Sequence, residues 1–323
     1  MKLWLFILGI VFFVGCSSAQ TEQTSGTTEM GSESSNPFLN ATFYVDPDSN
    51  AAEQIIDWQA TRPEDAALLD AIASQPAANW FGDWNDDIAA NVDNKVSTIT
   101  DASALPVLVA YNIPNRDCGG YSAGGAADSE AYLDWIEAFA GAIGERAAVV
   151  ILEPDSLGLV SCLSEADVTI RYSLLQQAVA IFKTYAQTYV YIDAGHSNWI
   201  EAVEMADRLT QASISEADGF ALNVSNFYTN AENIAYGEEL SALVGDKHFI
   251  IDTSRNGLGS NGEWCNPDGR ALGTNPTTQT GNDLVDAYLW IKPPGESDGT
   301  CNGGPDAGSW WAEYALGLVE NVL

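Results

Sequence analysis

The sequence predicts an α/β fold built on a seven-stranded parallel sheet, and it favours a βα barrel among the forms of that fold. Three observations support this. Seven short runs of apolar and β-branched residues recur along the chain, helical patterns separate most of them, and polar side chains stand where several runs end. Nearly continuous apolar runs are typical of strands whose two faces are both covered by helices.

The expected elements can be placed on the chain in order. In residues 128–144, Asp128 or Ser129 can cap a helix whose apolar residues form one stripe. In residues 164–186, Ser164 can cap a second helix, with its charged residues expected on the face away from the core. The strands are expected at 79–84, 106–112, 148–153, 188–193, 219–224, 248–252 and 287–292.

The ends of these strands favour a barrel over a doubly wound sheet. No glycine-rich phosphate-binding sequence follows any of them, which argues against a nucleotide-binding sheet. In βα barrels the functional site lies at the C-terminal ends of the strands. The polar or aromatic residues expected there are Tyr111, Glu153, Asp155, Asp193, Asn223, Asp252 and Lys292.

The first residues are typical of an export signal. Lys2 precedes an apolar run that ends at Gly15 and Cys16, which resembles the processing site of a bacterial lipoprotein. Residues 1–19 are therefore expected to be a signal peptide with lipidation at Cys16, and plain cleavage after Ala19 is the alternative. Either route predicts an extracellular protein, secreted or lipid-anchored at the cell surface.

Residues 20–35 are expected to form a flexible linker rich in Ser, Thr and Glu, followed by one folded domain at 36–323. The formal net charge of the chain is −33. Such a charge repels nucleic acid and anionic membranes, so we expect no nucleic-acid partner and membrane contact only through a lipid anchor. A neutral partner is compatible with it.

The cysteines predict two disulfides. Apart from Cys16 their number is even, as expected for an exported protein. Zinc binding is disfavoured because no two cysteines lie close together and the chain has only two histidines. The four cysteines concerned are Cys118, Cys162, Cys265 and Cys301.

Three loops that follow strands carry acids. Asp117 lies in a Gly- and Ser-rich loop, Asp155 follows an apolar strand, and Asp298 lies with Lys292 and Glu296 in a turn-rich loop. An acid in apolar surroundings has a raised pKa, as a general acid working near neutrality requires. Each loop alone is compatible with an ordinary turn or a surface ion pair. Together on one barrel face they predict a catalytic site.

The ten tryptophans indicate the class of substrate. Several are expected in loops, where flat rings match the apolar faces of sugars: Trp80, Trp84, Trp199 and Trp264. Core packing is the simpler explanation for Trp58, Trp135 and Trp290. Carboxylates and aromatic rings, with neither a histidine-based nucleophile arrangement nor a metal-binding pattern, predict cleavage of glycosidic bonds.

Six motifs carry a resemblance to a known family. In order along the chain, YNIPNRDCGGYSAGG, ILEPDSLG, YIDAGHSNW, IDTSRNG, EWCNPDGRALG and LWIKPPGESDG resemble glycoside hydrolase family 6, the cellulases. The resemblance implies a distorted, incompletely closed seven-stranded parallel βα barrel that cleaves β-1,4-glucan with inversion. It also implies that Asp155 is the general acid, that Asp117 is a supporting carboxylate, and that Asp298 is the base, directly or through water.

The same resemblance implies sugar contacts and disulfide pairs. Tyr111 would press on the central sugar, and Ser122 would help to place the attacking water. Cys118 would pair with Cys162, and Cys265 with Cys301. No cofactor or metal is implied, and a monomer is expected. The other implied contacts with β-1,4-glucan chains, cellulose and cello-oligosaccharides, come from Trp80, Asp193, His196, Trp199, Asn223, Trp264, Lys292 and Glu296.

The connection between DTSRNG and EWC is short, which predicts an open cleft and therefore an endoglucanase. The alternatives are an exo-acting cellobiohydrolase of the same family, a non-catalytic glucan-binding surface protein, and an enzyme for related soluble β-glucans.

Overall fold

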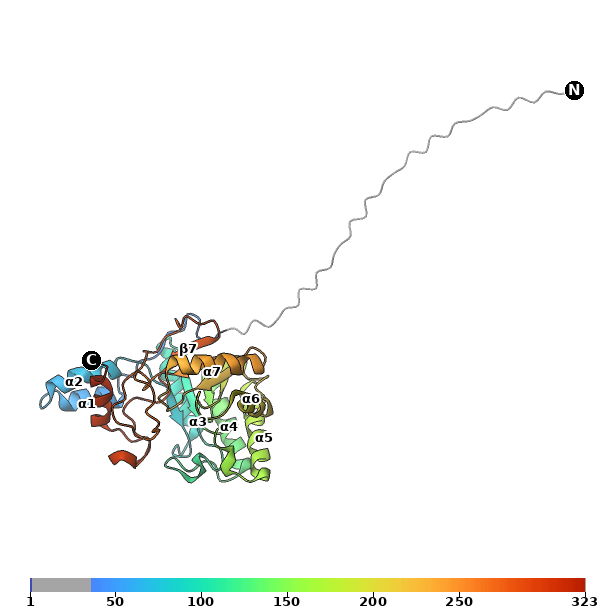
Figure 1. Cartoon of the computed structure of the whole chain (residues 1–323). Coiled ribbons are helices and arrows are strands. Elements are labelled where there is room, and N and C mark those ends of the chain that lie inside the picture. The colour runs from blue at the N-terminus through green and yellow to red at the C-terminus, as the bar shows by residue number, and fades with distance from the viewer. Residues whose placement is uncertain (2–35, 323) are drawn as a thin grey trace. The chain divides into compact units, whose positions relative to one another are not determined.

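Seven parallel strands form one sheet in which the spatial order of the strands is their order in the chain (Figure 1). The structure is a computed structural model that describes Met1 and residues 36–322. All of the expected signal peptide except Met1, the lipidation site Cys16 and the whole of the expected linker lie outside the described residues. The strands are β1 (Asn79–Phe81), β2 (Val107–Ala110), β3 (Ala148–Leu152), β4 (Thr188–Asp193), β5 (Gly219–Leu222), β6 (His248–Asp252) and β7 (Val285–Leu289).

Helices follow each of the first five strands, and three more helices flank this β/α series (Figure 1). Asp128 and Ser164 cap α4 and α5, as predicted, because each side chain accepts a hydrogen bond from a free N–H in the first turn. No helix among residues 36–322 is long and apolar enough to cross a membrane. The helices are α1 (Asn50–Trp58), α2 (Pro63–Ala73), α3 (Ile88–Asp101), α4 (Ser129–Ile143), α5 (Glu165–Phe182), α6 (Ala202–Gln211), α7 (Asn230–Leu243) and α8 (Ala312–Glu320).

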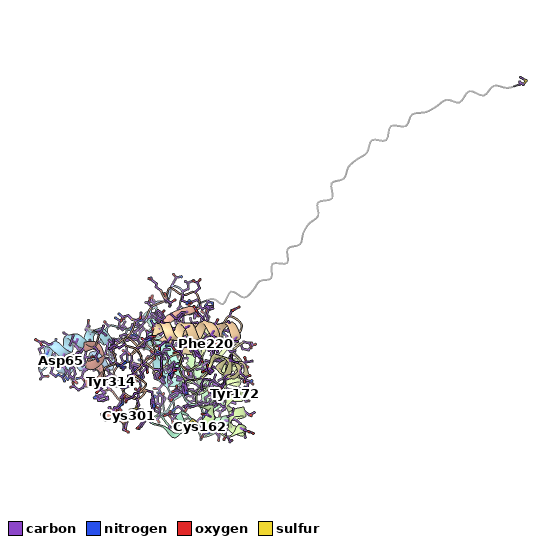
Figure 2. The ribbon with its side chains drawn as sticks, in the orientation of Figure 1. Asp65, Cys162, Tyr172, Phe220, Cys301 and Tyr314 are labelled. Carbon is purple, nitrogen blue, oxygen red and sulfur yellow. A yellow bond between two sulfur atoms is a disulfide. The ribbon has the colours of Figure 1, made fainter. Side chains whose placement is uncertain are left out.

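Side chains alternate between two cores along each strand. In β2, Leu108 and Ala110 pack against the surrounding helices, whereas Val107 and Val109 face the inside of the sheet. Phe220 of β5, labelled in Figure 2, belongs to the core between the sheet and the surrounding helices. A sheet with an enclosed inner core and a helical shell is a barrel.

The barrel does not close completely. In the described part of the chain β1 and β7 share no ladder, and single contacts bridge them. The Ala78 N–H donates to the Trp290 carbonyl (2.9 Å), and Trp80 Nε1 donates to the Ile291 carbonyl (2.7 Å). Beside this opening, α1, α2 and α8 pack around the buried Trp290. The prediction of a distorted, incompletely closed seven-stranded barrel is confirmed.

Three local expectations need correction. The last strand is Val285–Leu289 rather than 287–292, so Lys292 lies in the loop beyond it. Trp80 lies within β1 instead of a loop. Arg171 of α5 is only 3% exposed, although its charge was expected on the outer face. The three tryptophans explained by core packing do pack against the core: Trp290 is fully buried, and Trp58 and Trp135 are partly buried against their clusters.

Candidate active site

The two acids of the loop after β3, Glu153 and Asp155, differ in burial and in hydrogen bonding. Glu153 is fully buried, and its carboxylate accepts hydrogen bonds from the N–H groups of Asn112 and Ile113 (3.0 Å each). It therefore ties the end of β2 to the end of β3. Burial raises the pKa of Glu153 to about 7. Both Glu153 and Asp155 have positive φ, 51° and 66°, and this sharp turn leaves the second acid half-buried.

Asp155 sits among other acids. Its backbone N–H donates to Asp193 Oδ1 (2.9 Å), and Asp193 Oδ2 has no hydrogen-bond partner among residues 36–322. Burial, and then the negative charges of Asp193, Asp117 and Asp298, raise the pKa of Asp155 well above its usual range. Burial likewise raises the pKa of Asp193 to about 7. Asp155 is therefore suited to hold a proton at neutral pH and to release it to a basic oxygen.

Asp117 is held by its own loop. Its Oδ2 accepts a hydrogen bond from the Ser122 N–H (2.7 Å), and its backbone φ is 56°. Burial raises the pKa of Asp117 against this hydrogen bond and the charge of Arg116. Arg116 is buried and its ion pair is with Asp83 (3.0 Å), while its other donors bind the Ser122 and Tyr111 carbonyls. Arg116 thus fixes the loop that carries Asp117.

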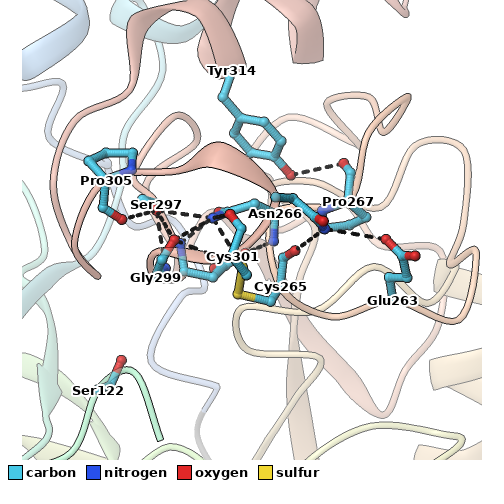
Figure 3. Close-up of a disulfide and its surroundings, with 12 residues drawn as sticks. Ser122, Glu263, Cys265, Asn266, Pro267, Ser297, Gly299, Cys301, Pro305 and Tyr314 are labelled. Carbon is cyan, nitrogen blue, oxygen red and sulfur yellow. Dashed lines mark hydrogen bonds between the residues drawn. A yellow bond between two sulfur atoms is a disulfide. The ribbon is translucent and has the colours of Figure 1, made fainter.

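Asp298 is buried, and its hydrogen-bond partners are Arg255 and Asn266. Its Oδ2 accepts from Arg255 Nη1 (2.9 Å) and from the Asn266 N–H (3.0 Å), and its own N–H donates to Asn266 Oδ1 (2.8 Å). The Asn266 side-chain amide also binds the Gly299 carbonyl (2.8 Å) beside the disulfide (Figure 3). Because both contacts to the carboxylate use Oδ2, Oδ1 is left for another group.

The predicted disulfide pairs are confirmed. Cys118–Cys162 joins the loop after β2 to the segment after β3, and Cys265–Cys301 joins the loop after β6 to the loop that carries Asp298 (Figure 3). Each bond ties an acid-bearing loop to a neighbouring loop on the same barrel face.

A cleft of about 1000 Å³ opens beside the loops that carry Asp117 and Asp298, although none of the acids described above is among its lining residues. Tyr111 and Ser122 line it, as do Trp80, Lys292 and Glu296. The Trp80 and Tyr111 rings meet edge to face at 5.3 Å, and Lys292 Nζ lies 3.5 Å from Glu296 Oε2. Five of the predicted sugar-contacting residues are therefore brought together in one cleft.

A second aromatic group does not line that cleft. Trp199 packs so closely on Gly158 and Gly195 that a Cβ on either residue would lie within about 3 Å of its ring. His196 stacks against Trp199 at 5.5 Å and against Tyr228 at 4.4 Å. Burial lowers the pKa of His196 to about 4, so this ring is neutral at pH 7. The three rings form a rigid stack next to the Asp155 loop.

Two other predicted residues have different settings. Trp264 is 55% exposed, and its ring lies 6.0 Å from that of Tyr121. Asn223 is fully buried, donates to the Asp252 carbonyl (2.8 Å) and accepts from the Tyr228 N–H (3.1 Å). In this structure Asn223 supports loops. Within residues 36–322, no three His, Cys, Asp or Glu side chains are arranged to hold a metal ion.

Several buried groups that shape the site had no specific predicted role. Arg255 lies in the DTSRNG motif and reaches Asp298, and Arg171 donates to the Ser156 and Pro114 carbonyls from α5. Asp252 accepts from the Ser225 and Lys292 N–H groups (3.0 and 2.9 Å). Asp252 and Arg255 both lie within the IDTSRNG motif at the end of β6, and that position was the available signal; Asp252 was expected on this face of the barrel, without a specific role. Arg171 lies inside a helix and offered none.

Comparisons with known proteins agree with one another. The model of the family described as "Glycosyl hydrolases family 6" matches residues 38–322. Endoglucanase 1 of Streptomyces halstedii is 49% identical over 289 residues, covering 86% of this chain and 88% of that protein. Endoglucanase A of Cellulomonas fimi is 45% identical over 291 residues, covering 88% of this chain but 62% of that protein.

A solved structure extends the comparison. The endoglucanase Cel6 from Mycobacterium tuberculosis, in complex with methyl-cellobiosyl-4-deoxy-4-thio-β-D-cellobioside, is 43% identical and superposes with a TM-score of 0.84. The match covers 89% of this chain and 99% of that one. A probable 1,4-β-D-glucan cellobiohydrolase C of Aspergillus terreus is 30% identical over 360 residues, covering 90% of this chain and 76% of that protein.

Proposed function

The chain belongs to glycosyl hydrolases family 6, and we propose that it is an endo-β-1,4-glucanase that hydrolyses internal bonds of glucan chains with inversion. The observation that carries the proposal is the setting of Asp155, a half-buried acid with a raised pKa among Asp193, Asp117 and Asp298. It lies on the barrel face where the aromatic cleft also opens. Relatives named endoglucanases, 45–49% identical, support the endo mode more than the 30% identical cellobiohydrolase does.

The reaction follows from these positions. Asp155 gives its proton to the glycosidic oxygen as the bond to the anomeric carbon breaks, and a water attacks that carbon from the opposite face. Asp298 takes the proton from the water at Oδ1, directly or through a second water, while Arg255 holds Oδ2. Asp117 adds negative charge that favours the cationic sugar in the transition state. Ser122, whose N–H binds Asp117, lines the cleft where the water would sit.

The cleft residues position a glucan. Trp80 supplies a flat surface, Lys292 and Glu296 supply polar groups for hydroxyls, and Tyr111 lies between Trp80 and the acids. Trp199 and Trp264 serve as further platforms outside this cleft. Since β-1,4-glucan is neutral, the net charge of −33 does not repel it. We propose cellulose chains and cello-oligosaccharides as the substrates.

We also propose that the protein works outside the cell, secreted or anchored by a lipid at Cys16, with residues 36–323 as its catalytic domain. The two disulfides support an oxidising compartment. Mass spectrometry of the N-terminus of the exported protein tests this directly. A diacylglycerol at Cys16 indicates an anchor, cleavage after Ala19 indicates secretion, and an intact Met1 on cytoplasmic protein would contradict both.

The activity is tested on soluble carboxymethylcellulose by following viscosity and reducing ends together. Internal cleavage lowers viscosity quickly while few new ends appear. Asp155→Asn should reduce the rate by about 10²–10⁴, as expected when a general acid is removed. Asp134→Asn, which changes an exposed acid on α4, is the matched control and should leave the rate unchanged. Slow viscosity loss with many ends would indicate exo action, and binding without cleavage would indicate a glucan-binding protein.

A further inference from the structure

We propose that the cleft continues past Trp80 into an outer sugar-binding region whose wall is Trp310, and that this region holds further β-1,4-linked glucosyl units of the chain being cut. The inference rests on the proposed function, because it assigns more of the same substrate to a part of the cleft with no assigned role. We call this part the outer region and define it by Trp310, Ser49, Gln75, Asn91 and Lys95, all of which line the cleft.

A continuous series of contacts places the outer region relative to the acids. Tyr111 meets Trp80 at 5.3 Å, and Lys292 Nζ lies 5.9 Å from the Trp80 ring centre. Lys292 pairs with Glu296 at 3.5 Å, and Glu296 is bridged by its backbone to Trp310. Trp310 therefore lies one step beyond the last residue of the predicted sugar site.

Trp310 is held in a fixed position. Its ring covers Gly295 so closely that a Cβ there would clash with it, and Nε1 donates to Gln54 of α1 (3.1 Å). The Trp311 N–H donates to the Gly295 carbonyl (2.8 Å), which fixes the next residue as well. A ring that is ordered before binding loses little conformational entropy when a sugar stacks on it. Trp310 is partly buried against the cluster formed by α1, α2 and α8, and it also lines the cleft.

The other side chains of the outer region suit a neutral polyhydroxylated ligand. Ser49, Gln75 and Asn91 offer hydroxyl and amide groups, which can both donate and accept hydrogen bonds. Lys95 is neutralised by Asp46 at 3.0 Å, so it adds no free cation. The volume of the whole cleft, about 1000 Å³, lies at the top of the range of roughly 300–1,000 Å³ for ligand pockets. The space therefore accommodates more than the sugars at Tyr111 and Trp80.

This assignment predicts that long chains react better than short ones. Binding energy from sugars remote from the broken bond can be used to orient the reacting sugar. A chain that reaches Trp310 gains this energy, whereas cellotriose positioned at Tyr111 and Trp80 does not. The preferred bond in a long oligosaccharide should then be the one that leaves the outer region filled.

The test compares Trp310→Ala with the parent on cellotriose, cellotetraose, cellopentaose and cellohexaose. We expect kcat/KM to fall about tenfold on cellohexaose, which corresponds to about 1.4 kcal/mol, and to stay within about twofold on cellotriose. The preferred bond in end-labelled cellohexaose should also shift. Gln75→Ala changes a polar contact without touching the packing of Trp310, and we expect about a threefold loss on cellohexaose only. Trp135→Ala, which removes a partly buried tryptophan of α4 that neither lines the cleft nor packs against the cluster around Trp310, is the matched control.

Two results would overturn the outer region. One is an equal loss on every chain length, which would mean that Trp310 has only a structural role, and the other is no loss at all. If the parent protein cleaves none of the four oligosaccharides, the proposed function has failed instead. Calorimetric titration of cellohexaose and cellotriose into the parent and Trp310→Ala then tests the outer region separately. The proposal requires that Trp310→Ala bind cellohexaose more weakly than the parent does and bind cellotriose equally well.

Discussion

Buried acids lie at both ends of this barrel, but their partners differ. At the N-terminal ends of the strands, Asp286 accepts from Tyr191 Oη (2.6 Å) and lies 2.8 Å from His248 Nδ1. At the C-terminal ends, Asp193 Oδ2 has no partner within residues 36–322, and Asp155 lies among other acids. Burial raises the pKa of Asp286 and of Asp193 alike. What distinguishes the candidate active site is therefore incomplete pairing of buried charge, because buried charge itself occurs at both ends.

The two ends of the barrel also differ in where residues with positive φ lie. At the N-terminal end of the barrel, Ser103 and Ser213 have positive φ just after helices, where such residues commonly end a helix. At the C-terminal end, Glu153, Asp155 and Asn223 have positive φ directly after strands, where no helix needs to be ended. Each such residue costs of order 1–3 kcal/mol, and it persists because the surrounding hydrogen bonds fix it.

The largest expected effect comes from breaking the buried ion pair between Arg255 and Asp298. Arg255→Met leaves Asp298 buried without its cation, and removing one partner of a buried pair costs about 3–5 kcal/mol. We expect this loss in urea unfolding, together with a fall in activity of more than tenfold. Asp93→Asn, which weakens the pair that the exposed Asp93 forms with Arg146, is the control and should cost no more than about 1 kcal/mol. Equal losses in the two variants would contradict the assignment.

The next prediction concerns Asp193, whose Oδ2 has no hydrogen-bond partner among residues 36–322. Folding raises the pKa of Asp193 from its ordinary value of 3.8 to about 7, so the native protein keeps a proton that the unfolded chain releases. Its contribution to stability therefore falls as the pH rises from about 4 to about 7. Asp193→Asn removes this titration and should gain stability relative to the parent by up to about 4 kcal/mol between pH 4 and pH 8.

This difference is measured by urea unfolding of both proteins at each pH. Glu153 titrates in the same range, but it is present in both proteins and cancels in the comparison. Activity of Asp193→Asn should decrease most above about pH 7, where Asp193 of the parent is ionised and its negative charge favours the protonated form of Asp155. A stability difference that is constant with pH would show that Asp193 is ionised in the native protein throughout.

Much of the fold could be predicted because it depends on apolar periodicity. The strands and the caps at Asp128 and Ser164 follow from local pattern. The end of β7 was wrong because Trp290 is buried against α1, α2 and α8 rather than by the sheet, so the apolar run continues past the strand. Arg171 was misplaced for a related reason, since helical periodicity assigns charges to solvent and cannot foresee backbone carbonyls that accept from them.

The site was predictable to the extent that it lies at strand ends. The strand pattern placed Asp155 and Asp193 together on one face, whereas the disulfide pairs required the resemblance to a family. Local pattern could not separate Glu153 from Asp155, although they are two residues apart. Glu153 differs from Asp155 in that its carboxylate accepts hydrogen bonds from the N–H groups of Asn112 and Ile113. These two residues follow β2, so a pattern local to β3 does not contain them.

At the N-terminal end of the barrel we expect a substitution to lower stability and to leave activity nearly unchanged. Asp286→Asn weakens two hydrogen bonds of a buried carboxylate, and bonds to charged groups contribute about 1.5–3 kcal/mol. Unfolding in urea should show a loss of that size, while the rate on carboxymethylcellulose at 25 °C should stay within twofold. A large loss of activity in protein that remains folded would mean that the two ends of the barrel are coupled.

The smallest expected effect lies in the aromatic stack. Tyr228→Leu removes the ring that stacks on His196 at 4.4 Å, so His196 and Trp199 lose support on one side. Aromatic pairs contribute about 0.5–1.5 kcal/mol beyond their buried area. We therefore expect KM for cello-oligosaccharides to rise about two- to tenfold with kcat nearly unchanged, because the stack positions a platform and does not touch the acids. Tyr228→Phe keeps the ring and should restore KM. If kcat falls instead, the stack also positions Asp155 through the contact of Trp199 with Gly158. The aromatic stack would then contribute to catalysis as well as to substrate binding.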